Sequence, residues 1–281
     1  MATVYLNGQF LPDDKALISP LDRGFTYGDG VYEWIRAYNG KPFLLDEHFA
    51  RLASSCAKMR IGVHLTPLEE VAVRLLRENG LGGDGAIYLQ VTRGTAPRSH
   101  VFPPADTKPT VFAMAWAFKP NPAFGPGGPG AIAILEPDVR WSRCDIKVTS
   151  LVPNSFSAQR ARELGAHEGL FVRDGVVQEG SLSNFFAVFD GEVRTAPLSN
   201  YILPGITRAV VLDLCREHGI PCRETPVFAT ELGEADELFL TSTVYDVVPI
   251  DFLDGRKLPA ERPVTRRLAE LFRAAVEREC A

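Results

Sequence analysis

The sequence predicts an α+β protein rich in antiparallel sheet, and three observations carry this prediction. Apolar, strand-like runs are separated by Asn-Gly or Asp-Gly pairs, which supply the positive backbone dihedrals that two-residue hairpin turns need. Helix signals occur among these hairpins without the strict alternation of a parallel α/β fold. The length of 281 residues corresponds to about two domains at roughly 150 residues each. The turn pairs are Asn7-Gly8, Asn39-Gly40, Asp174-Gly175, Asp190-Gly191 and Asp254-Gly255.

Five helices are expected along the chain. One is bounded by local signals, because Thr66-Pro67-Leu68-Glu69 has the pattern of a capping box with proline at the first helical position. The pair Asn79-Gly80 should end that helix. The others are expected at residues 46–58, 155–164, 207–217 and 265–280.

One segment separates the chain into two parts. Residues 119–130 have Pro or Gly at most positions and are interpreted as an interdomain linker. The expected domains are therefore a smaller N-terminal α+β domain, residues 1–118, and a larger C-terminal one, residues 131–281.

Composition and charge exclude several classes of protein. Hydrophobic residues make up 46% and charged residues 23%, as in an ordinary globular protein, and the net charge is −5. This mild acidity argues against a nucleic-acid binder or an anionic-membrane binder, and no apolar run approaches the roughly 20 residues of a membrane span. The five scattered cysteines contain no C-x-x-C pair, so neither a metal site nor a disulfide framework is indicated. With no apparent signal peptide, a cytoplasmic location with reduced thiols is expected.

Lys147 differs from the other six lysines, which lie in polar, turn-like or helix-surface contexts. It occupies a strand-like segment, in which Ile146 and Val148 would point to one side and Lys147 to the other. In a partly dry cleft the pKa of such an amine falls, and the neutral form can attack a carbonyl to form a Schiff base. The alternative is a lysine on the solvent face of a half-exposed strand, which is the commoner case for this segment alone.

Pyridoxal phosphate is the commonest aldehyde cofactor for such a lysine, and it requires an acid and an anion site. Glu179, at the end of a hairpin strand before a turn of small residues, could face the ring nitrogen; the alternative is an exposed strand-end glutamate. A helix beginning near Thr207, after Pro204-Gly205, could bind a phosphate through free N–H groups, or could be an ordinary helix start. Arg51 and the hydroxyls of residues 241–243 could add to this site.

A long connection joins two strand-like runs, residues 86–93 and 110–117. Its sixteen residues, 94–109, include Arg98 and His100, which would lie on one side of an extended loop and could clamp a carboxylate. The alternative is a solvated loop, although its three prolines stiffen it.

These residues together resemble the fold-type IV pyridoxal-phosphate enzymes, and most closely the bacterial D-amino acid aminotransferases. The resemblance extends over essentially the whole chain. Its strongest segments are residues 22–33, 91–100, 140–147, 179–184 and 202–208.

The resemblance implies a role for each candidate residue. Lys147 would hold the cofactor as a Schiff base and move the substrate proton, with Glu179 at the ring nitrogen. The phosphate would be bound by Arg51, the backbone of Ile206 and Thr207, and the hydroxyl of Thr243. A carboxylate trap would combine Tyr32 with Arg98 and His100 from the neighbouring subunit of a homodimer. Tyr88, Glu33 and Arg140 would orient the lysine, the trap and the ring, with Lys147, Tyr32 and Glu33 forming the catalytic set.

The implied reaction is reversible amino transfer between a D-amino acid and a 2-oxo acid in two half-reactions, with D-alanine and 2-oxoglutarate as the expected pair. The Arg-x-His pair distinguishes this subfamily, because branched-chain L-aminotransferases of the same fold characteristically lack it. Alternatives are an L-branched-chain or R-amine transaminase, an aminodeoxychorismate lyase, or a non-catalytic binding protein on the same scaffold. Pro153 and Phe156 depart from the family pattern and are expected to reshape the start of the following helix.

Overall fold

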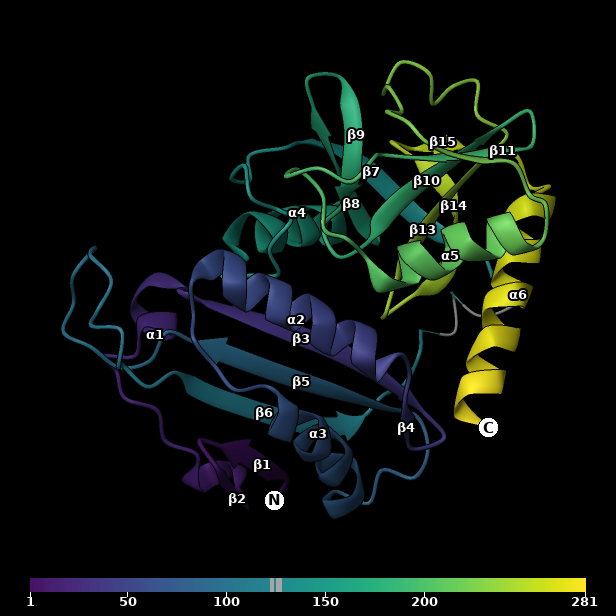
Figure 1. Ribbon diagram of the computed structural model, residues 1–281. Coiled ribbons are helices and arrows are strands. Elements are labelled where there is room, and N and C mark those ends of the chain that lie inside the picture. Colours follow the sequence, from purple (N-terminus) through teal and green to yellow (C-terminus); the bar gives the residue numbers. More distant parts are fainter. Residues whose placement is uncertain (122–123, 125–127) are drawn as a thin grey trace. The chain divides into compact units, whose positions relative to one another are not determined.

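The computed structural model describes residues 1–121, 124 and 128–281 (Figure 1). These residues form two compact units: the first contains residues 1–119, 146–151 and 279–281, and the second residues 120–145 and 152–278. Part of the expected linker, residues 122, 123 and 125–127, lies outside the described residues.

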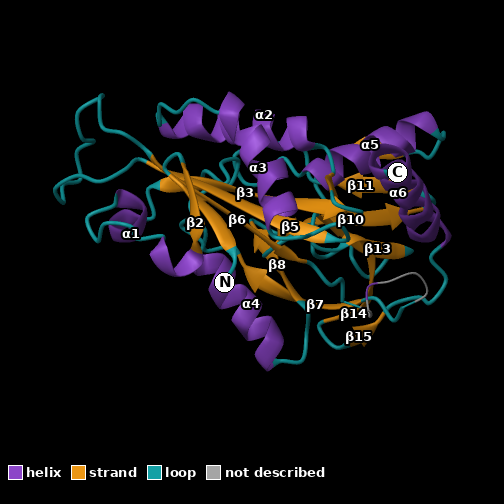
Figure 2. Ribbon diagram, turned by 90° about the horizontal axis from the view of Figure 1, so that it is seen from below, coloured by secondary structure: helices purple, strands orange, loops and turns teal. Residues whose placement is uncertain are grey.

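The first unit contains a six-stranded antiparallel sheet with the order β2-β1-β6-β5-β3-β4. Helices α2 and α3 lie on one face of it (Figures 1 and 2), where Leu52 and Leu75 share an apolar core with Val31, Ile35 and Leu89. The strands are β1 (Thr3–Leu6), β2 (Gln9–Pro12), β3 (Gly30–Tyr38), β4 (Lys41–Pro42), β5 (Gly85–Thr92) and β6 (Thr110–Ala117). The helices are η1 (Asp13–Lys15), α1 (Arg23–Tyr27), α2 (Leu45–Met59) and α3 (Thr66–Glu78).

The second unit is built on a nine-stranded mixed sheet with the order β12-β11-β10-β13-β14-β7-β8-β9, with β15 paired to β14. The pairings β11–β12, β14–β7 and β7–β8 are parallel. The strands are β7 (Ala131–Pro137), β8 (Glu168–Arg173), β9 (Val176–Gly180), β10 (Asn184–Phe189), β11 (Glu192–Thr195), β12 (Cys222–Glu224), β13 (Glu237–Ser242), β14 (Asp246–Leu253) and β15 (Arg256–Lys257). The helices are α4 (Val152–Glu163), α5 (Ile206–Glu217) and α6 (Pro263–Cys280).

All five expected hairpin turns are confirmed. The Asn-Gly and Asp-Gly pairs connect β1 to β2, β3 to β4, β8 to β9, β10 to β11 and β14 to β15. Both residues of each pair have positive φ, as at Asn7 (48°) and Gly8 (95°). The turn sequence therefore fixes these strand pairings locally.

The five expected helices are present, but the capping expected for α3 and the start expected for α4 differ from the structure. The expected capping box is wrong: Leu65 already has helical dihedrals, so Thr66 lies inside the helix and no side chain caps its first turn. Helix α4 begins at Val152, three residues earlier than expected, because Pro153 needs no N–H partner in a first turn. Phe156 is 73% exposed on this helix.

The segment around Lys147 also differs from expectation, both in structure and in its unit. It is not a strand; it has one bridge, between Val148 and Val31, and the Tyr32 N–H donates to the Lys147 carbonyl at 2.9 Å. These contacts, with Ile146 and Val148 buried in the same core as β3, place residues 146–151 with the first unit. The sequence boundaries had assigned the lysine to the C-terminal domain.

Candidate functional site

Lys147 lies beside a pair of stacked tyrosines in the first unit. Its Nζ is 4.4 Å from the centroid of the Tyr32 ring, which stacks on Tyr88 at 5.5 Å and 30°. The side chain is half-buried, and its amine has no hydrogen bond or ion pair within the described part of the chain. The amine is thus held against an aromatic face while its nitrogen remains available for chemistry.

Tyr88 is held in its protonated form. Its hydroxyl donates to Gln90 Oε1 at 2.6 Å, two residues further along β5. Burial, with a smaller contribution from Tyr32, raises the pKa of Tyr88 to about 12. Tyr88 therefore supports the Tyr32 ring sterically and has no proton to give or take at neutral pH.

Glu33 holds Arg51 and His48 through hydrogen bonds to its carboxylate. It is buried on β3 and accepts hydrogen bonds from Arg51 Nε (2.8 Å) and Nη2 (2.7 Å) and from His48 Nδ1 (2.7 Å). Burial alone would raise the pKa of Glu33, but the Arg51 and His48 partners bring it down to about 2. Burial lowers the pKa of His48, and the charge of Lys147 contributes to that lowering.

His48 is a residue that the sequence interpretation missed. Its signal was its position three residues before Arg51, which places both side chains on one face of α2. His48 and Arg51 together bind the carboxylate of Glu33 on β3.

Arg98 and His100 are brought together by a third aromatic residue, Tyr27. The Arg98 guanidinium carbon is 5.0 Å from the centroid of the Tyr27 ring, and the His100 ring meets the same ring edge-on at 5.7 Å. Both side chains are exposed. Within this chain their described contacts are with Tyr27 and not with Tyr32.

Helix α1, which ends at Tyr27, is also joined to the segment that follows Lys147. The helix is capped by Gly28 in the left-handed region (φ 63°), and the Gly28 carbonyl accepts hydrogen bonds from Thr149 Oγ1 (3.0 Å) and Ser150 Oγ (2.9 Å). A Cβ at position 28 would come within 2.3 Å of Ser150 Oγ. The close approach of these two segments therefore requires glycine.

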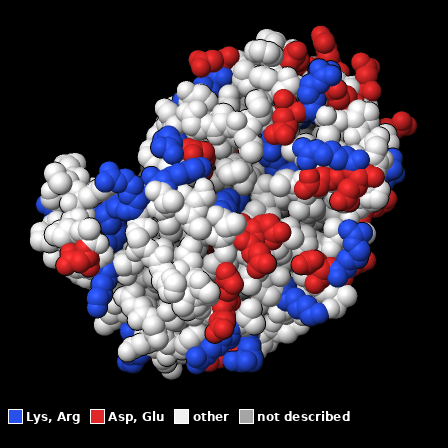
Figure 3. Space-filling view, viewed as in Figure 1, with Lys and Arg blue, Asp and Glu red and all other residues white. Residues whose placement is uncertain are grey.

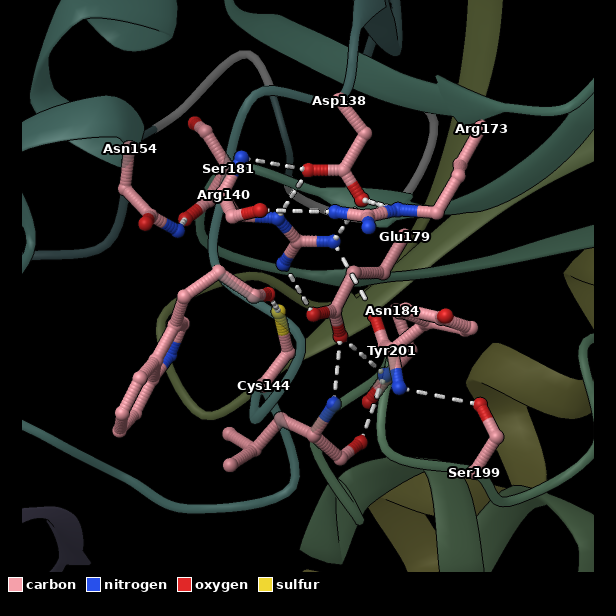
Figure 4. A network of polar contacts seen from close by, with 12 residues as sticks. Asp138, Arg140, Cys144, Asn154, Arg173, Glu179, Ser181, Asn184, Ser199 and Tyr201 are labelled. Atoms are coloured by element: carbon pink, nitrogen blue, oxygen red, sulfur yellow. Dashed lines mark hydrogen bonds and ion pairs between the residues drawn. The ribbon is translucent and has the colours of Figure 1, made fainter.

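Glu179 is the centre of a buried network in the second unit (Figure 4). Arg140 Nη1 donates to its Oε1, while Asn184 Nδ2 (3.1 Å) and the Leu203 N–H (2.9 Å) donate to its Oε2. Burial raises the pKa of Glu179 to about 7, and the Arg140 charge and the Leu203 N–H oppose that rise. Its charge near neutral pH is therefore sensitive to any further cation placed beside it.

Arg140 is itself fixed by Asp138, a second residue that the sequence interpretation missed. Asp138 accepts from Arg140 Nε at 2.9 Å and from Arg173 Nε at 3.1 Å, and Arg140 also donates to the Tyr201 carbonyl. Burial would raise the pKa of Asp138, but the two arginines lower it. The alternation of Asp138 and Arg140 in one extended segment was the available signal.

The first turn of α5 has the features of an anion-binding site. Its N-cap, Gly205, makes no side-chain capping bond, so the N–H groups of Ile206 and Thr207 point out of the helix start. A Cβ at Gly205 would come within 1.9 Å of Asn184 Oδ1, so this turn lies against the residue that bonds Glu179.

Strand β13, on which α5 packs, brings hydroxyl groups to the same region of the second unit. Thr241 is opposite Asn184 in the sheet register, and its Oγ1 is buried with no hydrogen-bond partner among the described residues. Thr243 follows in the next turn and is half-buried. An orphaned hydroxyl near an uncapped helix start fits a phosphate-bearing group.

The comparisons with known proteins define the class of this protein. Residues 30–252 match the model of the family described as amino-transferase class IV, and the chain therefore belongs to that family. It is 38% identical over 281 residues to the D-alanine aminotransferase of Staphylococcus haemolyticus, covering 99% of each chain.

Solved structures confirm the expected fold class. A fold IV transaminase from Curtobacterium pusillum has a TM-score of 0.84 and 26% identity, covering 97% of this chain and 99% of the other. The branched-chain amino acid aminotransferase of Escherichia coli has a TM-score of 0.89 and 26% identity, covering 97% and 94%.

Surface and helix properties add two observations. On the face shown in Figure 3, acidic and basic side chains are interspersed. None of the helices within the described residues combines the length and the apolar character needed to cross a bilayer.

Proposed function

We infer that this class IV aminotransferase uses pyridoxal 5'-phosphate to transfer the amino group of a D-amino acid to a 2-oxo acid. The observation that carries this conclusion is the similarity to D-alanine aminotransferases along nearly the full length of both chains. D-alanine and 2-oxoglutarate are the expected pair, in a ping-pong sequence of two half-reactions.

The residues of the chain fit this cofactor. Lys147 offers an amine without an ion-pair partner among the described residues, and α5 offers an uncapped first turn beside the orphaned Thr241 hydroxyl. When bound, pyridoxal phosphate supplies an aldehyde that accepts the amino group and a ring that withdraws electrons from the reacting carbon.

We propose that Lys147 is the residue that holds the cofactor covalently and carries the proton between the reacting carbons. Tyr32, 4.4 Å from the amine, limits the positions that Nζ can take. Glu33 acts in this proposal through Arg51, because its bonds to Arg51 and His48 leave it no described bond to the lysine.

Two further groups of residues are proposed to bind the cofactor. Glu179 would accept a hydrogen bond from the ring nitrogen, for which Oε1 has a free lone pair beside Arg140. The phosphate would be bound by the N–H groups of Ile206 and Thr207, the hydroxyl of Thr243 and the charge of Arg51.

The substrate carboxylate is proposed to be bound by Tyr32 together with Arg98 and His100 of a second copy of the chain. The exposure of Arg98 and His100, and their contact with Tyr27 instead of Tyr32, supports a role outside their own protomer. Large apolar side chains exposed on the first unit, among them Leu17 (83%) and Phe25 (79%), support a homodimer. Sedimentation of an active monomer would contradict this arrangement.

An L-branched-chain activity is the second candidate, because branched-chain aminotransferases are among the similar structures. The residues that favour the D-specific reaction over it are Arg98 and His100. An R-amine transaminase or an aminodeoxychorismate lyase would also use this fold, and the lyase would release pyruvate without an acceptor acid.

The deciding experiment offers the holoenzyme D-alanine, L-leucine and an R-amine in separate spectroscopic titrations, each without acceptor. We expect D-alanine to convert the absorption spectrum to that of the pyridoxamine form and 2-oxoglutarate to reverse it. Conversion by L-leucine but not by D-alanine would instead assign the branched-chain reaction.

The role of Lys147 is tested with Lys147→Ala and, as a matched control, Lys58→Ala on the surface of α2. We expect Lys147→Ala to abolish turnover and the absorbance of covalently held cofactor, because no other described amine replaces it. Full activity of Lys147→Ala would refute the assignment.

We propose a cytoplasmic location, supported by the five cysteines, all of which are free thiols. Trapping of thiols in intact cells would show them reduced if the proposal holds.

A further inference from the structure

We infer that Tyr27 is a positioning residue for the substrate carboxylate, because its ring holds Arg98 and His100 together on the loop of residues 94–109. The inference rests on the proposed function, in which Arg98 and His100 bind the carboxylate. Tyr27 would act on the substrate only through Arg98 and His100.

The geometry brings two guanidinium groups and an imidazole to the ring of Tyr27. Arg98 lies over the ring of Tyr27 at 5.0 Å, Arg23 lies over it at 4.6 Å, and the His100 ring meets it at 5.7 Å and 65°. A cation over an aromatic face is attracted by the negative charge of the π system. The ring therefore attracts the guanidinium groups of Arg23 and Arg98 and opposes the repulsion between them.

The backbone beneath these side chains is fixed by a buried ion network. Arg23 Nη1 donates to the Ser99 carbonyl at 2.6 Å, so the residue between Arg98 and His100 is tied to α1. Arg23 Nε donates to Asp29 at 2.7 Å, and Arg93, at the root of the loop, donates to the same carboxylate at 2.8 Å. The two arginines keep the pKa of Asp29 below its usual range, against the effect of burial.

This network fixes the backbone of the loop, but it does not fix the side-chain directions of Arg98 and His100. Immobilising a long arginine side chain on binding costs conformational entropy, and a contact that restricts it beforehand lowers that cost. Tyr27 is the described residue whose ring touches both Arg98 and His100. It is therefore expected to affect substrate binding more than turnover.

The ring, and not the hydroxyl, carries this role. The Tyr27 hydroxyl is buried and has no hydrogen-bond partner among the described residues. Tyr27→Phe keeps the ring and should retain the wild-type KM values. Tyr27→Leu removes the aromatic face but keeps an apolar side chain. This contrast separates the contact with Arg98 and His100 from a general effect on folding.

The experiment measures kcat and the KM for D-alanine and for 2-oxoglutarate with the holoenzymes of Tyr27→Leu, Tyr27→Phe, Arg98→Gln and the double variant Tyr27→Leu/Arg98→Gln. We expect Tyr27→Leu to raise both KM values about tenfold with kcat changed less than twofold. In the Arg98→Gln background, Tyr27→Leu should add less than a further twofold, because its effect passes through Arg98. Cofactor absorbance and Tm report the integrity of each variant, and Tyr27→Met replaces Tyr27→Leu if that variant loses cofactor.

The outcomes separate the inference from the proposed function. If Arg98→Gln raises the KM values and the ring-deleting variants do not, the inference is overturned and the carboxylate role of Arg98 stands. Additive effects of Tyr27→Leu and Arg98→Gln would also overturn it, since Tyr27 would then act elsewhere. If Arg98→Gln leaves the KM values unchanged, the carboxylate role and the inference fail together.

Discussion

Two buried glutamates, one in each unit, pair with an arginine, yet their pKa values move in opposite directions. Burial acts to raise both, but Glu33 titrates at about 2 and Glu179 at about 7. Glu33 receives two N–H donors from Arg51 and one from His48, whereas Glu179 receives one from Arg140, whose other nitrogens serve Asp138 and a carbonyl. The pKa of each buried carboxylate therefore follows the number of arginine N–H groups that donate to it.

The largest loss of stability is expected from substitution of Glu33. Glu33→Gln leaves Arg51 buried without its counter-charge, and we expect the free energy of unfolding to fall by about 3–5 kcal/mol. Glu179→Gln should cost less, about 1–2 kcal/mol, because Glu179 is close to its own pKa at neutral pH. Denaturant unfolding of the two apoenzyme variants measures both values. A larger loss for Glu179→Gln would contradict the expected order.

Glu33 and Glu179 are expected to give pH dependences of stability with opposite signs. The folded pKa of Glu33 is depressed, so its stabilisation is complete above its unfolded value near 4.5 and is lost as the pH falls toward 2. The folded pKa of Glu179 is raised, so the apoenzyme loses stability as the pH rises from about 4.5 to 7.

Each of these contributions amounts to about 3 kcal/mol over its range. Urea unfolding compares the wild-type apoenzyme with Glu179→Gln over this pH range. The loss of stability as the pH rises from about 4.5 to 7 should occur in the wild type alone. Added pyridoxal phosphate should flatten it, because a protonated ring nitrogen favours ionised Glu179. Equal slopes in both proteins would contradict the raised pKa.

A smaller effect is expected from Asp138→Asn. This substitution removes the anion that competes with Glu179 for Arg140 and that itself raises the pKa of Glu179. The midpoint of the Glu179-dependent slope should move to lower pH, with a loss of about 2 kcal/mol from the weakened bonds to Arg140 and Arg173. An unmoved midpoint would show that Asp138 only supports the network sterically.

The smallest effect is expected at an exposed pair, Arg216 and Asp213 on α5, joined at 2.6 Å but more than half exposed. Asp213→Asn should change the free energy of unfolding by at most about 0.5 kcal/mol, because water screens the pair. A larger change would mean that distance, and not burial, governs these ion pairs.

Local signals in the sequence predicted the hairpins, since each Asn-Gly or Asp-Gly pair determines its own dihedrals. Lys147 and Glu179 could be proposed because each has an unusual local setting. The bond of Arg173 to Asp138 could not be predicted, because these two residues meet across 35 residues of chain. The same holds for the position of residues 146–151 along β3, which depends on tertiary contacts formed far from that segment.

Helix α1 has only five residues, yet its end supports two loops with different proposed tasks. Tyr27 contacts Arg98 and His100 of one loop, and the next residue, Gly28, accepts hydrogen bonds from the chain that follows Lys147. In a homodimer with exchanged loops, these tasks would belong to two different catalytic centres. Single substitutions in residues 22–29 should then change both KM and kcat, because each one disturbs the loop that serves one centre and the lysine segment that serves the other.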